Sequence, residues 1–122
     1  MNCCIVEMGS NIEPDKNIEQ ALSLLRLQNR IIAVSTVLTT SPLGITHQPD
    51  FRNGAVKIET SLSQSQFKLY LKKIEDELKR DRNRPKFGPR TIDLDIIVWN
   101  GKVIDNDYYE RDFVKQTVDE IK

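Results

Sequence analysis

The sequence has little that would indicate a disulfide-rich or membrane protein. Only two of its 122 residues are cysteines, and because Cys3 and Cys4 are adjacent, their side chains would point to opposite faces of a strand. This pair therefore offers neither a disulfide framework nor a zinc site. No apolar run approaches the roughly 18 residues of a membrane span, and no basic leader followed by an apolar segment opens the chain. We expect a cytoplasmic protein with no membrane partner.

An excess of charge of one sign is also absent. The 18 basic residues balance 18 acidic ones, so the formal net charge is zero. Because nucleic acids and anionic membranes attract positively charged proteins, no general affinity for either is expected. The length suffices for one domain with a core and is too short for two, so residues 1–122 are predicted to form a single domain.

Apolar spacing and turn residues predict an α+β fold. Strands are expected at about 3–8, 30–40, 53–60, 91–99 and 103–104, and helices at about 14–28, 63–79 and 107–121. A loop with two prolines (41–50) joins the second and third strands, and Asn100-Gly101 is typical of a hairpin turn. The order β-α-β-β-α-β predicts a ferredoxin-like antiparallel sheet with both main helices on one face. A short extra strand and a C-terminal helix are appended.

The strand expected at residues 91–99 carries two aspartates among apolar residues. Because strand side chains alternate, Asp93 and Asp95 would share one face, exposed to solvent. The opposite, apolar face would be formed by Ile92, Leu94, Ile96 and Val98. Aspartate is disfavoured in strands and like charges on one face repel, so the pair calls for a compensating cation. An ordinary pair of solvated charges is the alternative.

A basic segment directly precedes this strand. Residues 79–90 hold six basic residues against one acid, and a turn at Gly88-Pro89 would hold Arg90 near the strand entrance. Paired carboxylates suit Mg²⁺, and the planar guanidinium of arginine suits phosphate oxygens. The two segments together therefore indicate a polyphosphate site with metal ions, and phosphoryl transfer as its chemistry.

Several motifs in chain order resemble one family. They are Gly9-Ser10-Asn11, Ser41-Pro42-Leu43-Gly44, Gln48-Pro49-Asp50-Phe51-Arg52-Asn53 and Phe87-Gly88-Pro89-Arg90-Thr91-Ile92-Asp93-Leu94-Asp95. From residue 3 to about residue 104 the chain resembles the 6-hydroxymethyl-7,8-dihydropterin pyrophosphokinases of folate biosynthesis. The last motif is highly specific, whereas Gly-Ser-Asn alone would be weak. The resemblance implies that ATP donates its β,γ-diphosphate to the hydroxymethyl oxygen of the pterin and that AMP is released.

The resemblance also implies roles for single residues on the ATP side. Asp93 and Asp95 would hold two Mg²⁺ ions that clamp the triphosphate. The catalytic residues would be Arg80, Arg90, Asp93 and Asp95. The residues that bind ATP would be Glu75, Arg80, Arg82, Arg90, the backbone around Ile96, and Arg111.

A second group of residues is implied to bind the pterin. It consists of Thr40, Pro42, Leu43, Phe51, Asn53 and Phe113. Phe51 would stack on the flat ring and the amide of Asn53 would read its edge. From the residues alone, Phe51 as a core residue and Asn53 as a turn residue stay open. Gly9-Ser10-Asn11 as a plain turn and helix cap also stays open.

The chain departs from the family pattern at its C-terminal end. A Pro-His segment is missing there, although Arg111 and Phe113 match an Arg-x-Phe motif, and Phe87 stands where an indole commonly covers the pterin. We therefore expect a functional but slow enzyme. One alternative is a non-catalytic homologue that binds nucleotide or pterin. Another is an RNA-binding module of the same topology, although acidic residues on an open strand argue against it. Protein partners are left undecided.

Overall fold

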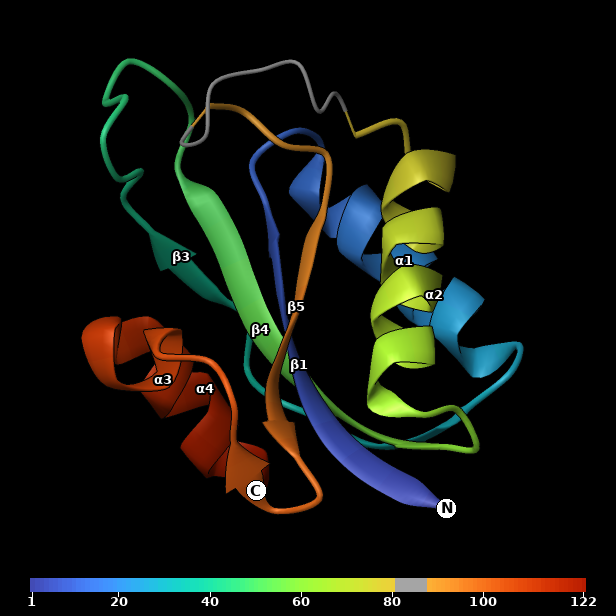
Figure 1. Cartoon of the computed structure of the whole chain (residues 1–122). Helices are drawn as coiled ribbons and strands as arrows, with labels where there is room; N and C mark the ends of the chain where they lie inside the picture. Colours follow the sequence, from blue (N-terminus) through green and yellow to red (C-terminus); the bar gives the residue numbers. More distant parts are fainter. Residues whose placement is uncertain (81–87) are drawn as a thin grey trace.

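An antiparallel sheet with helices on both faces forms the body of the protein, as the computed structural model of residues 1–80 and 88–122 shows (Figure 1). Its strands are β1 (Asn2–Ser10), β2 (Arg30–Val34), β3 (Leu38–Thr40), β4 (Phe51–Thr60), β5 (Asp93–Trp99) and β6 (Lys102–Val103). Its helices are α1 (Pro14–Arg26), α2 (Gln64–Glu77), α3 (Asp107–Glu110) and α4 (Asp112–Ile121). The strand order β2-β4-β1-β5-β6, with β3 also paired to β4, confirms the predicted ferredoxin-like fold. In the described ranges, no helix is both long enough and apolar enough to cross a membrane.

One face of the sheet, here called the α1/α2 face, carries a closed apolar core. The predicted stripes of both helices are buried against it. Helix α1 contributes Ile18, Ala21, Leu22 and Leu25, and helix α2 contributes Phe67, Leu71 and Ile74. The strands supply Val6, Met8, Val56, Ile58 and Leu94, and Ile92 joins them from just before β5. The apolar stripes of the two helices and the apolar faces of the strands, both predicted from the sequence, therefore pack together in one core.

Local signals in the sequence set two of the boundaries. The hydroxyl of Ser63 accepts a hydrogen bond from the Gln66 amide (3.3 Å), and the Gln66 side chain accepts one from the Ser63 amide (3.0 Å), which is a capping box at the start of α2. At the predicted hairpin, Asn100 and Gly101 have φ angles of 50° and 82°, which glycine and asparagine tolerate. The predicted hairpin turn is confirmed, and the helix expected from about residue 63 begins at this cap.

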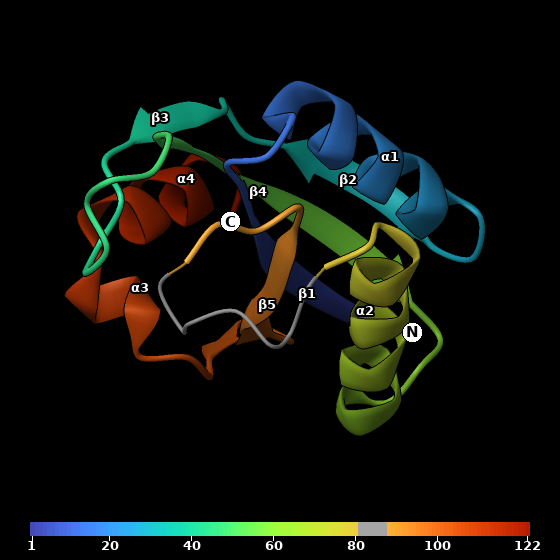
Figure 2. The same cartoon turned by 90° about the horizontal axis from the view of Figure 1, so that it is seen from above.

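The opposite face, here called the α3/α4 face, is covered by the C-terminal helices (Figure 2). Its apolar part is small and consists of Ile5, Ala55, Ile97, Val98, Tyr108, Val114 and Val118. Two carboxylates form hydrogen bonds between α4 and the sheet or its loops. Glu7 of β1 accepts one from the hydroxyl of Thr117 (2.7 Å), and Glu120 of α4 accepts one from the hydroxyl of Thr36 (2.9 Å). The apolar cluster leaves one end of this face uncovered. The polar residues of the face lie at that end.

Two predicted elements are each divided in the structure. The strand expected at 30–40 is interrupted at Ser35, whose hydroxyl accepts a hydrogen bond from the Ala55 amide (2.7 Å) and donates one to the Thr36 carbonyl (2.9 Å). The helix expected at 107–121 is interrupted at Arg111, whose backbone is extended (φ −126°, ψ 112°). In both places an apolar pattern continues through a backbone break, so periodicity alone could not reveal it.

The faces of β5 also differ in part from the prediction. Ile5 pairs with Val98 while Val6 pairs with Ile96, so Ile97 is an extra residue on β5. This bulge turns Val98 to the α3/α4 face, whereas the prediction placed it with Ile96. The aspartates do share one face, but that face is not open to solvent, because α3 and α4 cover it and the Asp93 side chain is only 27% exposed.

Candidate functional site

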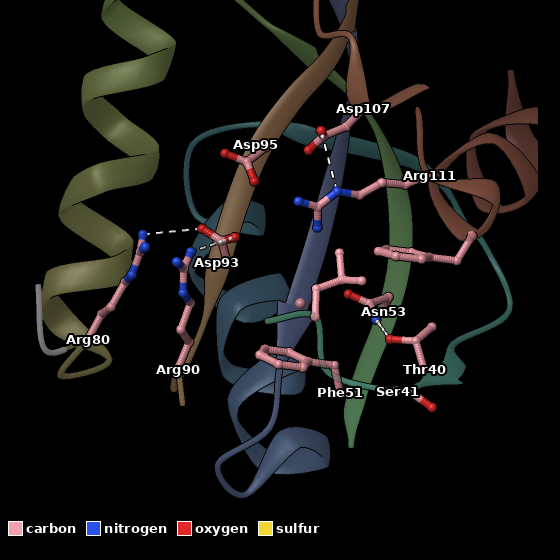
Figure 3. A pocket seen from close by; sticks show the side chains of 13 residues that line it. Thr40, Ser41, Phe51, Asn53, Arg80, Arg90, Asp93, Asp95, Asp107 and Arg111 are labelled. Carbon is pink, nitrogen blue, oxygen red and sulfur yellow. Dashed lines mark hydrogen bonds and ion pairs between the residues drawn. The ribbon is translucent and has the colours of Figure 1, made fainter. Parts of the chain in front are cut away.

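A pocket of about 320 Å³ opens on the α3/α4 face beside the small apolar cluster (Figure 3). Strands, loops and both C-terminal helices contribute to it. The described residues that line it are Gly9, Thr40, Ser41, Leu43, Phe51, Asn53, Arg80, Arg90, Asp93, Asp95, Asp107, Arg111 and Phe113. Segments that lie far apart in the sequence thus converge on one site.

The floor of the pocket is a row of three paired residues across the sheet. Gly9 in β1 pairs with Asn53 in β4 on one side and with Asp93 in β5 on the other. A Cβ atom on Gly9 would lie 2.7 Å from the Asn53 side-chain oxygen, so only glycine lets this amide rest over β1. The glycine of the Gly-Ser-Asn motif is therefore part of the site and not only a turn residue.

One side of the pocket can recognise a flat heterocycle. The Asn53 side chain is almost fully buried (6% exposed), and its amide group donates a hydrogen bond to the Thr40 hydroxyl (2.6 Å), which fixes its orientation. Phe51 pairs with Thr40 on the same face of the sheet, and Phe113 lines the pocket from α4. Aromatic rings with one oriented amide suit a flat ring that carries polar groups on its edge.

The opposite side of the pocket is built from arginines and aspartates. Asp93 forms ion pairs with two arginines, one on each oxygen: Arg80 at 3.2 Å and Arg90 at 3.1 Å. Arg80 also pairs with Glu75 (3.0 Å). Figure 3 shows both guanidinium groups pointing at Asp93 from the same side. In this structure Asp93 and Glu75 therefore supply the two negative charges that balance these two arginines.

The Gly-Ser-Asn motif also holds Arg90 in place. The Asn11 side-chain oxygen accepts a hydrogen bond from the backbone N–H of Arg90 (2.8 Å), and the backbone N–H of Asn11 donates one to the Arg90 carbonyl (3.1 Å). The Asn11 side chain also donates to Gln48 (2.9 Å) and to the Pro49 carbonyl (3.0 Å). Asn11 thus joins the long loop to the basic segment, a role that the reading as a turn and cap missed.

Asp95 has a different environment from Asp93. No basic side chain in residues 1–80 or 88–122 forms an ion pair with it, and burial together with the charges of Asp93 and Glu75 raises its pKa. Glu7, its neighbour on β1, is more deeply buried, and burial raises its pKa to about 9. Among the described residues Asp95 thus lacks the basic partners that Asp93 has, and a bound cation would supply the missing counter-charge.

The third arginine of the pocket stands on the wall formed by the C-terminal helices. The Arg111 Nε atom lies 3.5 Å from an oxygen of Asp107, one turn earlier. Figure 3 shows Arg111 reaching toward β5 from the side opposite Arg80 and Arg90. The extended backbone at Arg111, which interrupts the predicted helix, lies at this wall of the pocket.

A second cavity of about 690 Å³ lies between α2 and β5. Its lining includes Lys68, Lys72, Glu75 and Ile96, and it shares Arg80 and Asp95 with the first pocket. Glu75 is buried (3% exposed), and one of its oxygens accepts a hydrogen bond from the Leu94 amide (2.8 Å) while the other pairs with Arg80. Glu75 therefore fixes α2 to β5 at the boundary of the two cavities.

Most residues predicted for the site are brought together. The first pocket is lined by ten of them: Thr40, Leu43, Phe51, Asn53, Arg80, Arg90, Asp93, Asp95, Arg111 and Phe113. Glu75 and Ile96 line the second cavity, and Pro42 lines neither. Arg82 and Phe87 lie outside the described residues. Sequence reasoning missed Glu7 and Asp107; the signal for Glu7 is a charged residue inside the apolar strand Cys3–Met8.

The carboxylates of the site suit a hard divalent metal ion. Their oxygens are the donors that Mg²⁺ prefers, and Asp95 has no cationic partner in the described ranges. Within those ranges no three acidic, histidine or cysteine side chains are placed to hold a metal together. A metal bound by two aspartates would therefore complete its shell with water and substrate phosphates, which is how Mg²⁺ is usually held.

Two adjoining cavities that meet at arginines and carboxylates suit the transfer of a phosphoryl group between two ligands. The sequence matches the 7,8-dihydro-6-hydroxymethylpterin-pyrophosphokinase family over residues 5–122. The chain belongs to this family of pyrophosphokinases.

Curated relatives agree with the family. The chain is 35% identical to the 2-amino-4-hydroxy-6-hydroxymethyldihydropteridine pyrophosphokinase of Bacillus subtilis, over 98% of this chain and 78% of the relative. It is 35% identical to the enzyme of the same name from Haemophilus influenzae, over 89% of this chain and 74% of the relative. The corresponding enzyme of Pseudomonas aeruginosa is 39% identical, over 82% of this chain and 63% of the relative. The resemblance inferred from the motifs is confirmed.

Proposed function

We propose that this protein transfers the β,γ-diphosphate of ATP to the hydroxymethyl oxygen of 6-hydroxymethyl-7,8-dihydropterin and releases AMP, in folate biosynthesis. The observation that carries the proposal is the junction of the two cavities. Arg80 and Asp95 line both of them, so a group transferred from one ligand to the other would pass between a guanidinium and a carboxylate. Holding two reactants in contact supplies much of the catalysis in such transfers.

The pterin would lie in the smaller pocket. Asn53, oriented by Thr40, would offer a hydrogen-bond acceptor to the edge of the ring, and Phe51 and Phe113 would hold its faces. The hydroxymethyl group would then point toward Asp95.

The nucleotide would lie in the larger cavity, between α2 and β5. The two lysines of its lining favour an anionic ligand, and the backbone near Ile96 offers hydrogen-bonding groups to a base. Arg80, Arg90 and Arg111 face the junction from two sides and would hold the triphosphate. When bound, two Mg²⁺ ions held by Asp93 and Asp95 would neutralise charge on the reacting phosphates.

The ion pairs of the site indicate how its ligands are admitted. Arg80 and Arg90 cannot turn fully to phosphate oxygens without leaving Asp93 uncompensated. A polyphosphate would draw the two arginines away from Asp93, and a cation would take their place on Asp93. The two ligands should therefore bind well only together.

This exchange of partners predicts that one substitution in the site raises the affinity for the nucleotide. In EDTA, Asp93→Asn should bind α,β-methylene-ATP about tenfold more tightly than the unchanged protein, because about 1.4 kcal/mol of competing charge interaction is removed. Isothermal titration calorimetry measures it. Asp95→Asn is the matched control and should change this metal-free affinity by less than about threefold. Equal affinities in the Asp93 variant and the unchanged protein would contradict the exchange.

The activity itself is tested by incubating the protein with ATP, Mg²⁺ and the hydroxymethyl dihydropterin, and measuring AMP and the pterin diphosphate by mass spectrometry. Equimolar formation of both supports the proposal. Binding of ATP with Mg²⁺ but no AMP under saturating substrates would favour a non-catalytic homologue. An omission of the pterin serves as the control, because it separates transfer from simple hydrolysis.

We also propose that the protein works in the cytoplasm and has no nucleic-acid partner. The net charge of zero gives no general attraction to phosphate backbones. The sheet face that an RNA-binding module of this topology would use is here covered by α3 and α4 and carries Asp93 and Asp95. A filter-binding assay with single-stranded RNA should show no retention at physiological salt.

A further inference from the structure

Glu7 is a buried acid that the proposed mechanism does not use. It lies in the middle of β1, with Ala55 of β4 as its partner on one side and Asp95 of β5 on the other. Side chains at paired positions lie on the same face, with Cβ atoms about 4.5–5.5 Å apart. Glu7 is therefore the neighbour of Asp95 on the floor beneath the junction of the two cavities.

The two carboxyl oxygens of Glu7 have different surroundings. One accepts a hydrogen bond from the hydroxyl of Thr117 in α4 (2.7 Å), and Thr117 is itself fully buried. The other is buried and has no hydrogen-bond partner in residues 1–80 or 88–122. The whole side chain is only 6% exposed. A buried polar atom without a partner costs free energy, so its position needs an explanation.

A small cavity connects Glu7 to the site above it. Its volume is about 50 Å³, and its polar walls include Glu7, Asp95, Asp107 and Arg111. This is room for at least one water molecule, which needs two to four polar partners to be held. Glu7 and Asp95 are both among the residues that line this space.

Stability alone does not account for Glu7. The next inward-facing residue of β1 is Ile5, and Ile97 and Val114 line the same small cavity, so an apolar residue would fill this place at lower cost. A role as a third metal ligand beside Asp93 and Asp95 is also unsupported, because in the described ranges no three acidic side chains are placed to share one ion. What remains is an action through Asp95.

We propose that Glu7 is a positioning residue for Asp95: held from below by Thr117, its second carboxyl oxygen orients the Asp95 carboxylate through a water molecule in the intervening cavity. The inference rests on the proposed function, in which Asp95 binds a metal ion. Outer groups that orient a ligating carboxylate commonly change metal affinity by 10- to 100-fold. The same arrangement couples α4, and with it Phe113, to the metal-binding strand.

Two substitutions of similar length separate positioning from packing. Glu7→Gln keeps an oxygen for Thr117 and a polar atom facing the cavity, whereas Glu7→Met fills the space with an apolar chain. The Kd for Mn²⁺ in the presence of α,β-methylene-ATP, from the electron paramagnetic resonance signal of free Mn²⁺, should stay within about threefold for Glu7→Gln. For Glu7→Met it should rise about tenfold or more, with a Tm equal to or above that of the unchanged protein.

Thr117→Val provides a second test that does not alter the acid. It removes the hydroxyl that holds Glu7 and should raise the Mn²⁺ Kd by about three- to tenfold. Val118→Ala is the matched control on the same helix: it should lower the Tm and leave the Mn²⁺ Kd unchanged, because it packs in the apolar cluster. Should Glu7→Met fail to fold, Thr117→Val still decides the question.

Several outcomes would overturn the assignment. Mn²⁺ affinity like that of the unchanged protein in Glu7→Met and Thr117→Val would show that Glu7 only packs. A loss in Glu7→Gln as large as in Glu7→Met would show that orientation by a polar group is not its role. Because Mn²⁺ binding is measured without turnover, a protein that binds Mn²⁺ with the nucleotide but forms no AMP would contradict the proposed function alone.

Discussion

The two faces of the sheet solve different problems with the same strands. On the α1/α2 face, two regular amphipathic helices bury a continuous apolar core. On the α3/α4 face, two shorter helices cover a smaller apolar cluster, and the remaining area holds ion-paired arginines, aspartates and a buried glutamate. The alternation of side chains lets β1, β4 and β5 serve both faces at once. Most of the stability should therefore come from the first face and the chemistry from the second.

The largest expected effect is on the chemistry of the α3/α4 face alone. Asp95→Ala should reduce AMP formation about a thousandfold or more, because a metal-binding carboxylate is lost. Its Tm at pH 8 should be unchanged or higher, since burial and neighbouring acids make its charged form unfavourable. A coupled assay for AMP and a thermal melt measure the two effects. Near-normal turnover would remove Asp95 from the proposed mechanism.

The converse substitution should weaken the packing of the α1/α2 face alone. Phe67 is fully buried and lies against the rings of Tyr70 and Trp99, at centroid distances of 5.9 and 6.1 Å. Phe67→Ala should lower the free energy of unfolding by about 3–5 kcal/mol. At a temperature where the variant stays folded, its KM for ATP should match that of the unchanged protein. Leu69→Ala, at an exposed position of the same helix, is the control and should have little effect.

The pH dependence of stability sharpens the comparison. The pKa of Glu7 is raised to about 9 in the folded protein, so the native state holds this proton more tightly than the unfolded chain does. The stability of the native state should therefore fall as pH rises from about 4.5 toward 9. Glu7→Gln should flatten this decline and be more stable at pH 8 by on the order of 1–3 kcal/mol.

Thermal melts at pH 5, 7 and 9 measure that decline. Glu19→Gln is the matched control, because Glu19 is an exposed residue of α1, on the other face of the sheet. The control should keep the slope of the unchanged protein. If Glu7→Gln also kept it, Glu7 would not be the acid that limits stability at high pH.

The smallest expected effect separates the two cavities of the second face. Asn53→Ala should raise the Kd of the pterin about tenfold, roughly 1.4 kcal/mol, because a polar edge loses its partner. The Kd of α,β-methylene-ATP with Mg²⁺ should barely change. Thr40→Val, which removes the hydroxyl that orients the amide, should act in the same direction more weakly. Calorimetry that shows equal losses for both ligands would assign Asn53 a structural role instead.

Local patterns in the sequence were sufficient for much of the architecture. The helix stripes, the Ser63 cap, the Asn100-Gly101 turn and the shared face of the two aspartates all depend on residues close in the chain. For this reason they could be read without tertiary contacts. The family motifs likewise named most of the residues that line the first pocket.

Features that depend on distant partners were not predictable in this way. Ser35 interrupts a strand because Ala55 offers a bond across the sheet, and the bulge at Ile97 turns Val98 because β1 sets the register. The bonds between Asn11 and Arg90 join residues far apart in the chain. Each of these required a contact that no local pattern encodes.

The sequence by itself determined which residues are chemically able to form the site: paired acids on one strand, a basic segment before it, and an aromatic ring and an amide just after the long loop. Tertiary structure decided how they are paired and covered. It set Arg80 and Arg90 on Asp93, left Asp95 beside Glu7, and placed α3 and α4 over a face that was expected to be open. The physical reason is that charge, shape and periodicity are local properties, whereas burial and counter-charge are set by segments that meet only in the folded chain.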